Sequence, residues 1–133
     1  MGRVVLAFAL AYGMLGGWTG CASERAETWE RYRSSFARLY PIAWGSAPSD
    51  EALGESQRRF DCMWERLEHP ADEFGCAIRG TDETVRCSED PAMRGNTVDC
   101  LRPERRACAP SRAFERASWD CAGERERRRM TRP

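Results

Sequence analysis

Six cysteines constrain this chain more than any other feature of its sequence. All six lie beyond residue 60, and a seventh, Cys21, stands apart near the N-terminus. An even number of cysteines in a small chain is typical of a disulfide framework, which persists in compartments more oxidising than the cytosol. No C-x-x-C spacing is present, so neither a redox motif nor a structural zinc site is indicated. The sequence therefore predicts no metal site and three disulfides among Cys62, Cys76, Cys87, Cys100, Cys108 and Cys121.

The pairing of these cysteines stays open, because six cysteines allow 15 connectivities. A sequential pairing would close three loops of similar length. It would join Cys62 to Cys76, Cys87 to Cys100 and Cys108 to Cys121.

Disulfides matter here because the apolar core must be thin. Leu, Ile, Val and Phe together number only 12 in residues 21–133, well below the share that a well-buried core normally needs. Aromatic residues offset part of this deficit, since each can bury a large apolar area. We expect a single domain over 21–133 that unfolds on reduction. The aromatic residues concerned are Trp29, Tyr32, Tyr40, Trp44, Trp64 and Trp119.

Charge excludes several classes of partner and chemistry. All 21 basic residues are arginine, so catalysis by a lysine amine is excluded. Acidic residues match them in number, which gives a formal net charge of zero. Neither nucleic acid nor an anionic surface is therefore indicated as a partner. The densest basic run, residues 125–132, is predicted to be a solvated, frayed tail.

Helical periodicity is clear in three segments. The first begins at the cap Ser23 and should stop at Pro41, and the second begins at the cap Ser49 and should close at Pro70. The third begins near Pro110 and ends around residue 123. Between the second and third helices, residues 71–106 carry glycines, prolines and short β-branched pieces, which indicate loops or a small strand pair. The predicted fold is mainly α, a small disulfide-stapled domain of about three helices with a loop-rich, cysteine-bearing middle segment.

The N-terminus has the pattern of an export signal. Arg3 is followed by an apolar run from Val4 to Leu15 that is too short to span a membrane with confidence, and then by Trp18-Thr19-Gly20-Cys21. This tetrapeptide resembles the lipobox of bacterial lipoprotein signals, although an aliphatic residue is usual at the position of Trp18.

The resemblance implies that residues 1–20 are a signal peptide and that Cys21 becomes the lipidated first residue of the mature chain. Acyl chains on Cys21 would anchor it to a membrane, and Ala22 and Ser23 favour the outer membrane or the cell surface over the inner membrane. Ordinary cleavage after Ala22 is the alternative, and it would give a soluble secreted or periplasmic protein.

Little in the sequence supports an enzyme. The only histidine, His69, falls at the expected end of the second helix, where a cap is the usual role, so we assign no catalytic residue and no cofactor. We expect a non-enzymatic binding or structural module that contacts another envelope protein or the cell wall through a loop or an aromatic face. The alternative is a small secreted hydrolase or hydrolase inhibitor, recognisable by carboxylates of raised pKa in a cleft or by a protruding disulfide-bounded loop.

Overall fold

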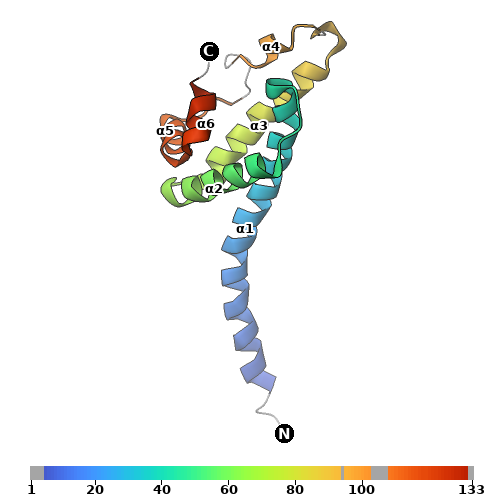
Figure 1. The fold of residues 1–133 in the computed structure, drawn as a ribbon. Helices are drawn as coiled ribbons and strands as arrows, with labels where there is room; N and C mark the ends of the chain where they lie inside the picture. The colour runs from blue at the N-terminus through green and yellow to red at the C-terminus, as the bar shows by residue number, and fades with distance from the viewer. Residues whose placement is uncertain (1–4, 94, 103–107, 132–133) are drawn as a thin grey trace.

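The computed structural model describes residues 5–93, 95–102 and 108–131, with the backbone alone for residues 5–22. The described chain is mostly helical and contains no strand, which confirms the predicted mainly α class. The N-terminal half of α1 extends away from the other helices, which gather around its C-terminal half (Figure 1). The elements in chain order are α1 (Val5–Trp44), α2 (Asp50–Arg66), α3 (Pro70–Glu89), the 3-10 turn η1 (Pro91–Met93), α4 (Thr97–Cys100), α5 (Arg112–Cys121) and α6 (Glu124–Met130).

The first helix continues past both of its predicted ends. Ser23, the expected cap, lies inside α1, where its hydroxyl donates to the Glu27 carboxylate at 3.3 Å. Pro41, the expected stop, lies in the last turn. A proline removes one backbone N–H from the helix, but the next turn can still form. Gly45, at φ +80°, then ends the helix by donating its N–H to the Pro41 carbonyl at 2.8 Å.

The second helix begins as predicted and ends early. The Ser49 side chain accepts the Ala52 N–H at 3.1 Å, but α2 ends at Arg66. Pro70 starts α3 instead of closing α2, because the first residue of a helix has no helical acceptor for an N–H. His69, predicted to cap the end of α2, takes the N-cap position of α3 and makes no side-chain capping bond there.

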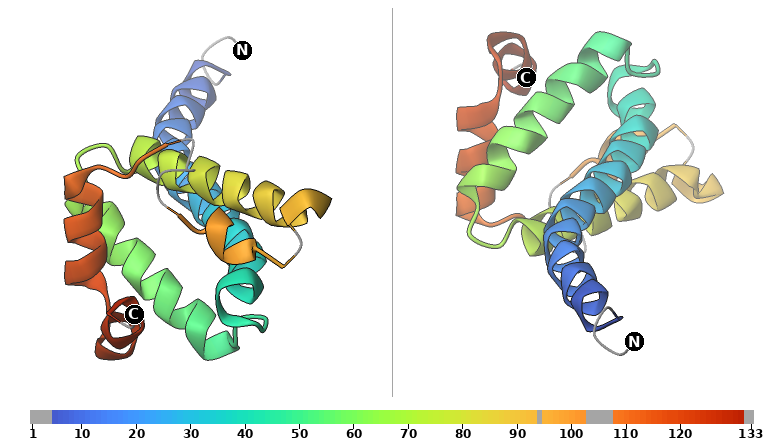
Figure 2. Two further views of the ribbon diagram at one scale, coloured as in Figure 1. Left: turned by 90° about the horizontal axis from the view of Figure 1, so that it is seen from above. Right: turned by 90° about the horizontal axis from the view of Figure 1, so that it is seen from below.

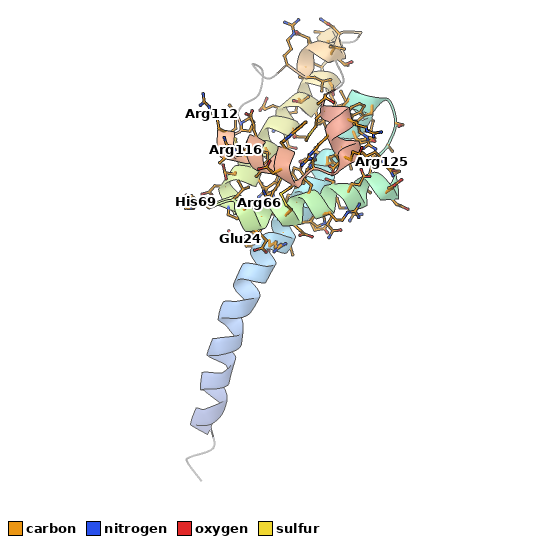
Figure 3. All side chains as sticks on the ribbon, turned by 60° about the vertical axis from the view of Figure 1, so that its left-hand side comes forward. Glu24, Arg66, His69, Arg112, Arg116 and Arg125 are labelled. Atoms are coloured by element: carbon orange, nitrogen blue, oxygen red, sulfur yellow. A yellow bond between two sulfur atoms is a disulfide. The ribbon has the colours of Figure 1, made fainter. Side chains whose placement is uncertain are left out.

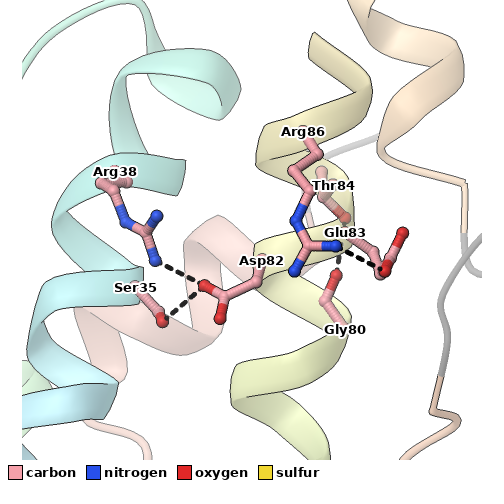
Figure 4. Close-up of polar contacts among 7 residues, drawn as sticks. All are labelled: Ser35, Arg38, Gly80, Asp82, Glu83, Thr84 and Arg86. Carbon is pink, nitrogen blue, oxygen red and sulfur yellow. Dashed lines mark hydrogen bonds and ion pairs between the residues drawn. The ribbon is translucent and has the colours of Figure 1, made fainter. Parts of the chain in front are cut away.

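The prediction of loops over residues 71–106 is wrong for most of that region. The 20-residue helix α3 fills its first half, and Phe74, Ile78 and Val85 form a buried stripe along it at helical spacing. Burial of this stripe overrides the local turn and strand preferences. Thr84 lies within α3, where its hydroxyl donates to the Gly80 carbonyl at 3.1 Å (Figure 4).

The third predicted helix is present as α5. The prediction of a frayed tail is wrong. Ser111 caps α5 by accepting the Phe114 N–H at 3.0 Å. After a break at residues 122–123 the chain forms α6, where the Gly123 N–H donates to Glu126 at 3.3 Å. The arginine-rich tail is ordered because its charges pair with α2, as described below.

An aromatic cluster forms the core where α1, α2, α3 and α5 meet. Phe74 is completely buried, and its ring centroid lies 4.5 Å from that of Phe60, 5.1 Å from that of Tyr32 and 5.3 Å from that of Phe114. The aromatic residues thus replace the missing aliphatic ones. Met63, Leu67 and Ala117 complete the buried cluster.

Charged side chains join α1 to its two neighbours. Ser35 and Arg38 of α1 both donate to the Asp82 carboxylate of α3, the serine hydroxyl at 3.1 Å (Figure 4). Arg25 donates to Asp61 and Glu65 of α2, at 3.0 and 2.7 Å. These contacts fix α1 against both α2 and α3 from residue 25 onward.

Three disulfides are present, as predicted, but the sequential pairing is wrong for two of them. Cys62 pairs with Cys121, Cys76 with Cys108, and Cys87 with Cys100, so that each bridge lies inside the loop of the previous one. The nested order follows from the fold, because the segments that follow α3 in the chain lie back against α3 and then against α2. Figure 2 shows α5 beside α2 at the edge of the body.

Candidate functional site

A groove opens where the end of α2, the start of α3 and the helix α5 meet. We call it the corner groove; it has a volume of about 850 Å³, within the range of pockets that hold small ligands. His69, Arg112 and Arg116 lie together at one side of the body, whereas Arg125 lies at the opposite side (Figure 3). The only histidine of the sequence is thus part of this groove.

The two sides of the corner groove carry opposite charges. Its basic side carries Arg66, Arg112 and Arg116, from α2 and α5, and also Asp120 of α5. Its acidic side consists of Glu68, Asp72 and Glu73, from the turn before α3 and the first turn of α3.

The base of the groove is apolar, and a disulfide and a hydrogen bond join the helices around it. Leu67 and Ala117, which line it, are also members of the core cluster. The Cys62–Cys121 disulfide joins α2 to α5, and the Ser111 hydroxyl donates to the Glu73 carboxylate between α5 and α3. Because covalent and polar links hold all three helices, the groove exists before a ligand binds.

Two acids of the groove are already engaged. Glu73 accepts the hydrogen bond from Ser111, and Asp120 lies 3.6 Å from Arg66. A general acid of a hydrolase must reach the substrate atom to which it gives its proton, whereas these two carboxylates contact Ser111 and Arg66 of the protein itself. The described side chains of the groove therefore suit recognition better than acid catalysis.

A smaller hollow of about 180 Å³ lies between α1, α2 and α6. Phe36, Tyr40 and Trp44 of α1 line it at successive turns, with neighbouring ring centroids 5.4 and 6.2 Å apart. Met130 of α6 closes it from the other side, and Trp44 is half exposed. This is the aromatic face of the molecule.

The helix α6 is held to α2 by charge. Arg125 contacts Glu51 at 2.6 Å and Glu55 at 3.6 Å, and Arg59 of α2 pairs with Glu126 of α6 at 3.0 Å. The guanidinium of Arg125, first by its hydrogen bond and then by its charge, lowers the pKa of Glu51. Burial opposes the charge of Arg59, but Tyr32, Glu126 and Glu55 outweigh that effect and raise its pKa.

From the middle of α6, Arg127 secures the junction with α5. Its guanidinium donates to the backbone carbonyls of Trp119 and Asp120 at 3.2 and 3.3 Å, and it lies 5.6 Å from the centroid of the Trp119 ring. An arginine that satisfies the last carbonyls of a helix stabilises its end. Arg125 and Arg127 of the tail therefore help to hold the folded domain together.

Among the described residues, no group of three or more His, Cys, Asp or Glu side chains is placed to hold a metal ion. Among residues whose side chains are described, no helix is long and apolar enough to cross a membrane. Cys21, the predicted lipidation site, lies in the part of α1 described by its backbone alone.

Sequence reasoning did not find the corner groove. In the sequence its arginines only contribute to a net charge of zero, with no sign that they lie together. Asp72 and Glu73 fall in the segment predicted as loops. The one available signal was Pro70 followed by two acids, which is the pattern of a helix start. No protein-family model, no curated protein and no solved structure matches the chain.

Proposed function

We propose that this protein is an exported, lipid-anchored envelope protein that acts as a non-enzymatic binding module. The observation that carries the proposal is the set of three disulfides. Bridges of this kind form and persist in oxidising compartments and are rare in the cytosol. A stapled domain with a thin core belongs in the periplasm or on the cell surface.

The anchor is proposed on Cys21. Cleavage before this residue would remove most of the part of α1 that extends from the body in Figure 1. Arg25, four residues later, already holds α1 to α2. A lipid on Cys21 would therefore hold the domain close to the membrane surface, with only a few residues between the anchor and the first fixed contact.

Binding is proposed at the corner groove, in place of the loops expected from the sequence. The groove is preformed, has an apolar base and presents charges of both signs, which are features of a recognition site. A hydrolase is less well supported, because Glu73 and Asp120 are engaged by Ser111 and Arg66. The Arg125 guanidinium lowers the pKa of Glu51, the opposite of what a general acid needs, and Glu51 lies on the α6 side of α2.

The anchor is tested by expressing the full chain in a Gram-negative bacterium and separating membranes from soluble fractions. We expect the wild-type protein in the membrane fraction, released by detergent and labelled by radioactive palmitate. Cys21→Ser should move the protein to the soluble fraction without label, while Ser23→Ala, a neighbouring change, should leave it with the membrane. A soluble wild-type protein, or a Cys21→Ser variant that stays membrane-bound, would refute the anchor.

A further inference from the structure

The corner groove leaves charges of both signs without partners. Arg112 and Arg116 lie one helical turn apart on α5, both exposed, and neither makes an ion pair or hydrogen bond within the described chain. Glu68 and Asp72 are likewise exposed on the opposite side and make none there. All four side chains are therefore available to a ligand.

At two other contacts between helices of the described chain, opposite charges pair with each other. Arg125 lies 2.6 Å from Glu51 between α6 and α2, and Arg25 lies 2.7 Å from Glu65 between α1 and α2. The corner groove combines unpaired charges of both signs with an apolar base: Leu67 lies between Arg66 and Glu68 in the chain, and Ala117 directly follows Arg116.

This combination of both charges with an apolar base determines the chemistry of a suitable occupant. A single small anion would use the arginines and leave the acidic side facing it, at an electrostatic cost. A peptide segment can present a carboxylate, an apolar side chain and a cation in sequence, and so match all three parts. Binding would cost less conformational entropy, because the disulfide and the Ser111–Glu73 hydrogen bond already hold the groove in shape.

Building on the proposed function, we propose that the corner groove binds a short segment of a partner protein in the envelope. An acidic side chain of the segment contacts Arg112 and Arg116, an apolar side chain covers Leu67 and Ala117, and a basic side chain contacts Glu68 and Asp72. The groove thus recognises a segment that carries both charges and an apolar side chain.

The test uses the full chain labelled with ¹⁵N and titrated with short blocked peptides, followed by NMR chemical shifts. The probe peptide has a glutamate and an arginine flanking leucines, and is made in both charge orders. Matched peptides replace one or both charged residues by glutamine. One charge order should shift the groove residues in a saturable way, more weakly at high salt. Each glutamine replacement should weaken binding.

Arg112→Gln combined with Arg116→Gln should weaken binding about three- to tenfold, the scale of two exposed ion pairs. Arg31→Gln combined with Arg79→Gln removes the same charge from exposed residues outside the groove and should leave binding unchanged. All four sites are exposed, and unchanged spectra elsewhere will show that the variants fold.

Three results of the peptide titration would overturn the proposal: no saturable shift in the groove, equal binding of the peptide without charges, or equal binding of the peptide without its arginine. The last result would make the groove a simple anion site. Binding of purified cell-wall fragments in place of any peptide would also overturn it. Membrane fractionation of the Cys21→Ser variant is independent of all these outcomes, so a failure of the anchor and a failure of the groove remain distinguishable.

Discussion

Arg59 and Glu126 form an ion pair of 3.0 Å although their side chains are only 13% and 10% exposed. The pair joins the middle of α2 to α6. Its glutamate belongs to the tail that charge composition alone predicted to be solvated. A buried pair tolerates the loss of one partner badly, because the remaining charge keeps its desolvation cost. The arginine-rich tail is therefore part of the folded domain.

Breaking this pair from one side should be costly. We expect Glu126→Gln to lower the free energy of unfolding by about 2–4 kcal/mol, measured by urea denaturation, because Arg59 stays buried without its carboxylate. Glu124→Gln removes the exposed partner of Arg128 and should change stability by less than about 0.5 kcal/mol. Arg59→Leu with Glu126→Leu should recover much of the loss. Equal effects of the two single changes would contradict this account of α6.

Acid should loosen α6 through Glu51. The Arg125 guanidinium lowers the pKa of Glu51 in the folded protein below its ordinary value near 4.5. A carboxylate of this kind contributes stability above its unfolded pKa, and the contribution is lost as pH falls toward the folded value. We expect the amide NMR signals of residues 124–130 to move as pH falls below about 4.5, before the core unfolds. Glu51→Gln should weaken this transition, and a variant that titrates like the wild type would exclude Glu51 as its source.

Phe74 is the residue on which the core depends most. It is fully buried and contacts rings from three other helices. Phe74→Ala should therefore lower the free energy of unfolding by about 3–5 kcal/mol, because it opens a cavity that its neighbours cannot fill. Phe36→Ala, on the partly exposed aromatic face, should have a smaller effect. Urea denaturation followed by circular dichroism measures both, and a cost for Phe74 below that for Phe36 would contradict the packing described.

The outermost disulfide should stabilise the fold more than the innermost. Cys62 and Cys121 are 59 residues apart and Cys87 and Cys100 are 13 apart. The chain-entropy model gives about 4 kcal/mol for the longer loop and about 3 kcal/mol for the shorter one. Paired alanine substitutions, compared by urea denaturation, test this order. The Cys62–Cys121 variant should also lose hydrogen-exchange protection in α5, and unchanged protection there would show that the bridge does not hold the groove.

The sequence predicted the elements whose signals are local. Ser49 is a predicted cap with a helical pattern behind it, and the structure confirms it, together with a helix that begins close to Pro110. The even cysteine count predicted the disulfides, but their partners could not be predicted. Nested pairing depends on how α2, α3 and α5 pack, which is information about the whole fold. Cys87–Cys100 is the one bridge that agrees with a sequential pairing, because its two residues are close in the chain.

Errors arose where tertiary contacts outweigh local preference. The stripe of Phe74, Ile78 and Val85 was hidden among glycines and β-branched residues, and burial against α1 and α2 makes it a helix. The tail was misjudged because its partners, Glu51 and Glu55, lie far earlier in the chain. The corner groove combines both problems, since it depends on an unpredicted helix and on contacts between distant segments.

The three disulfides are present, and the intact mass of the protein extracted from membranes most directly tests our proposal that the domain they hold together is exported and anchored. We predict a chain that begins at Cys21, carries acyl chains, and alkylates at its six other cysteines only after reduction. A chain that begins at Ser23 without lipid would contradict the anchor. Free thiols among the six before reduction would contradict the disulfide framework and the export argument built on it.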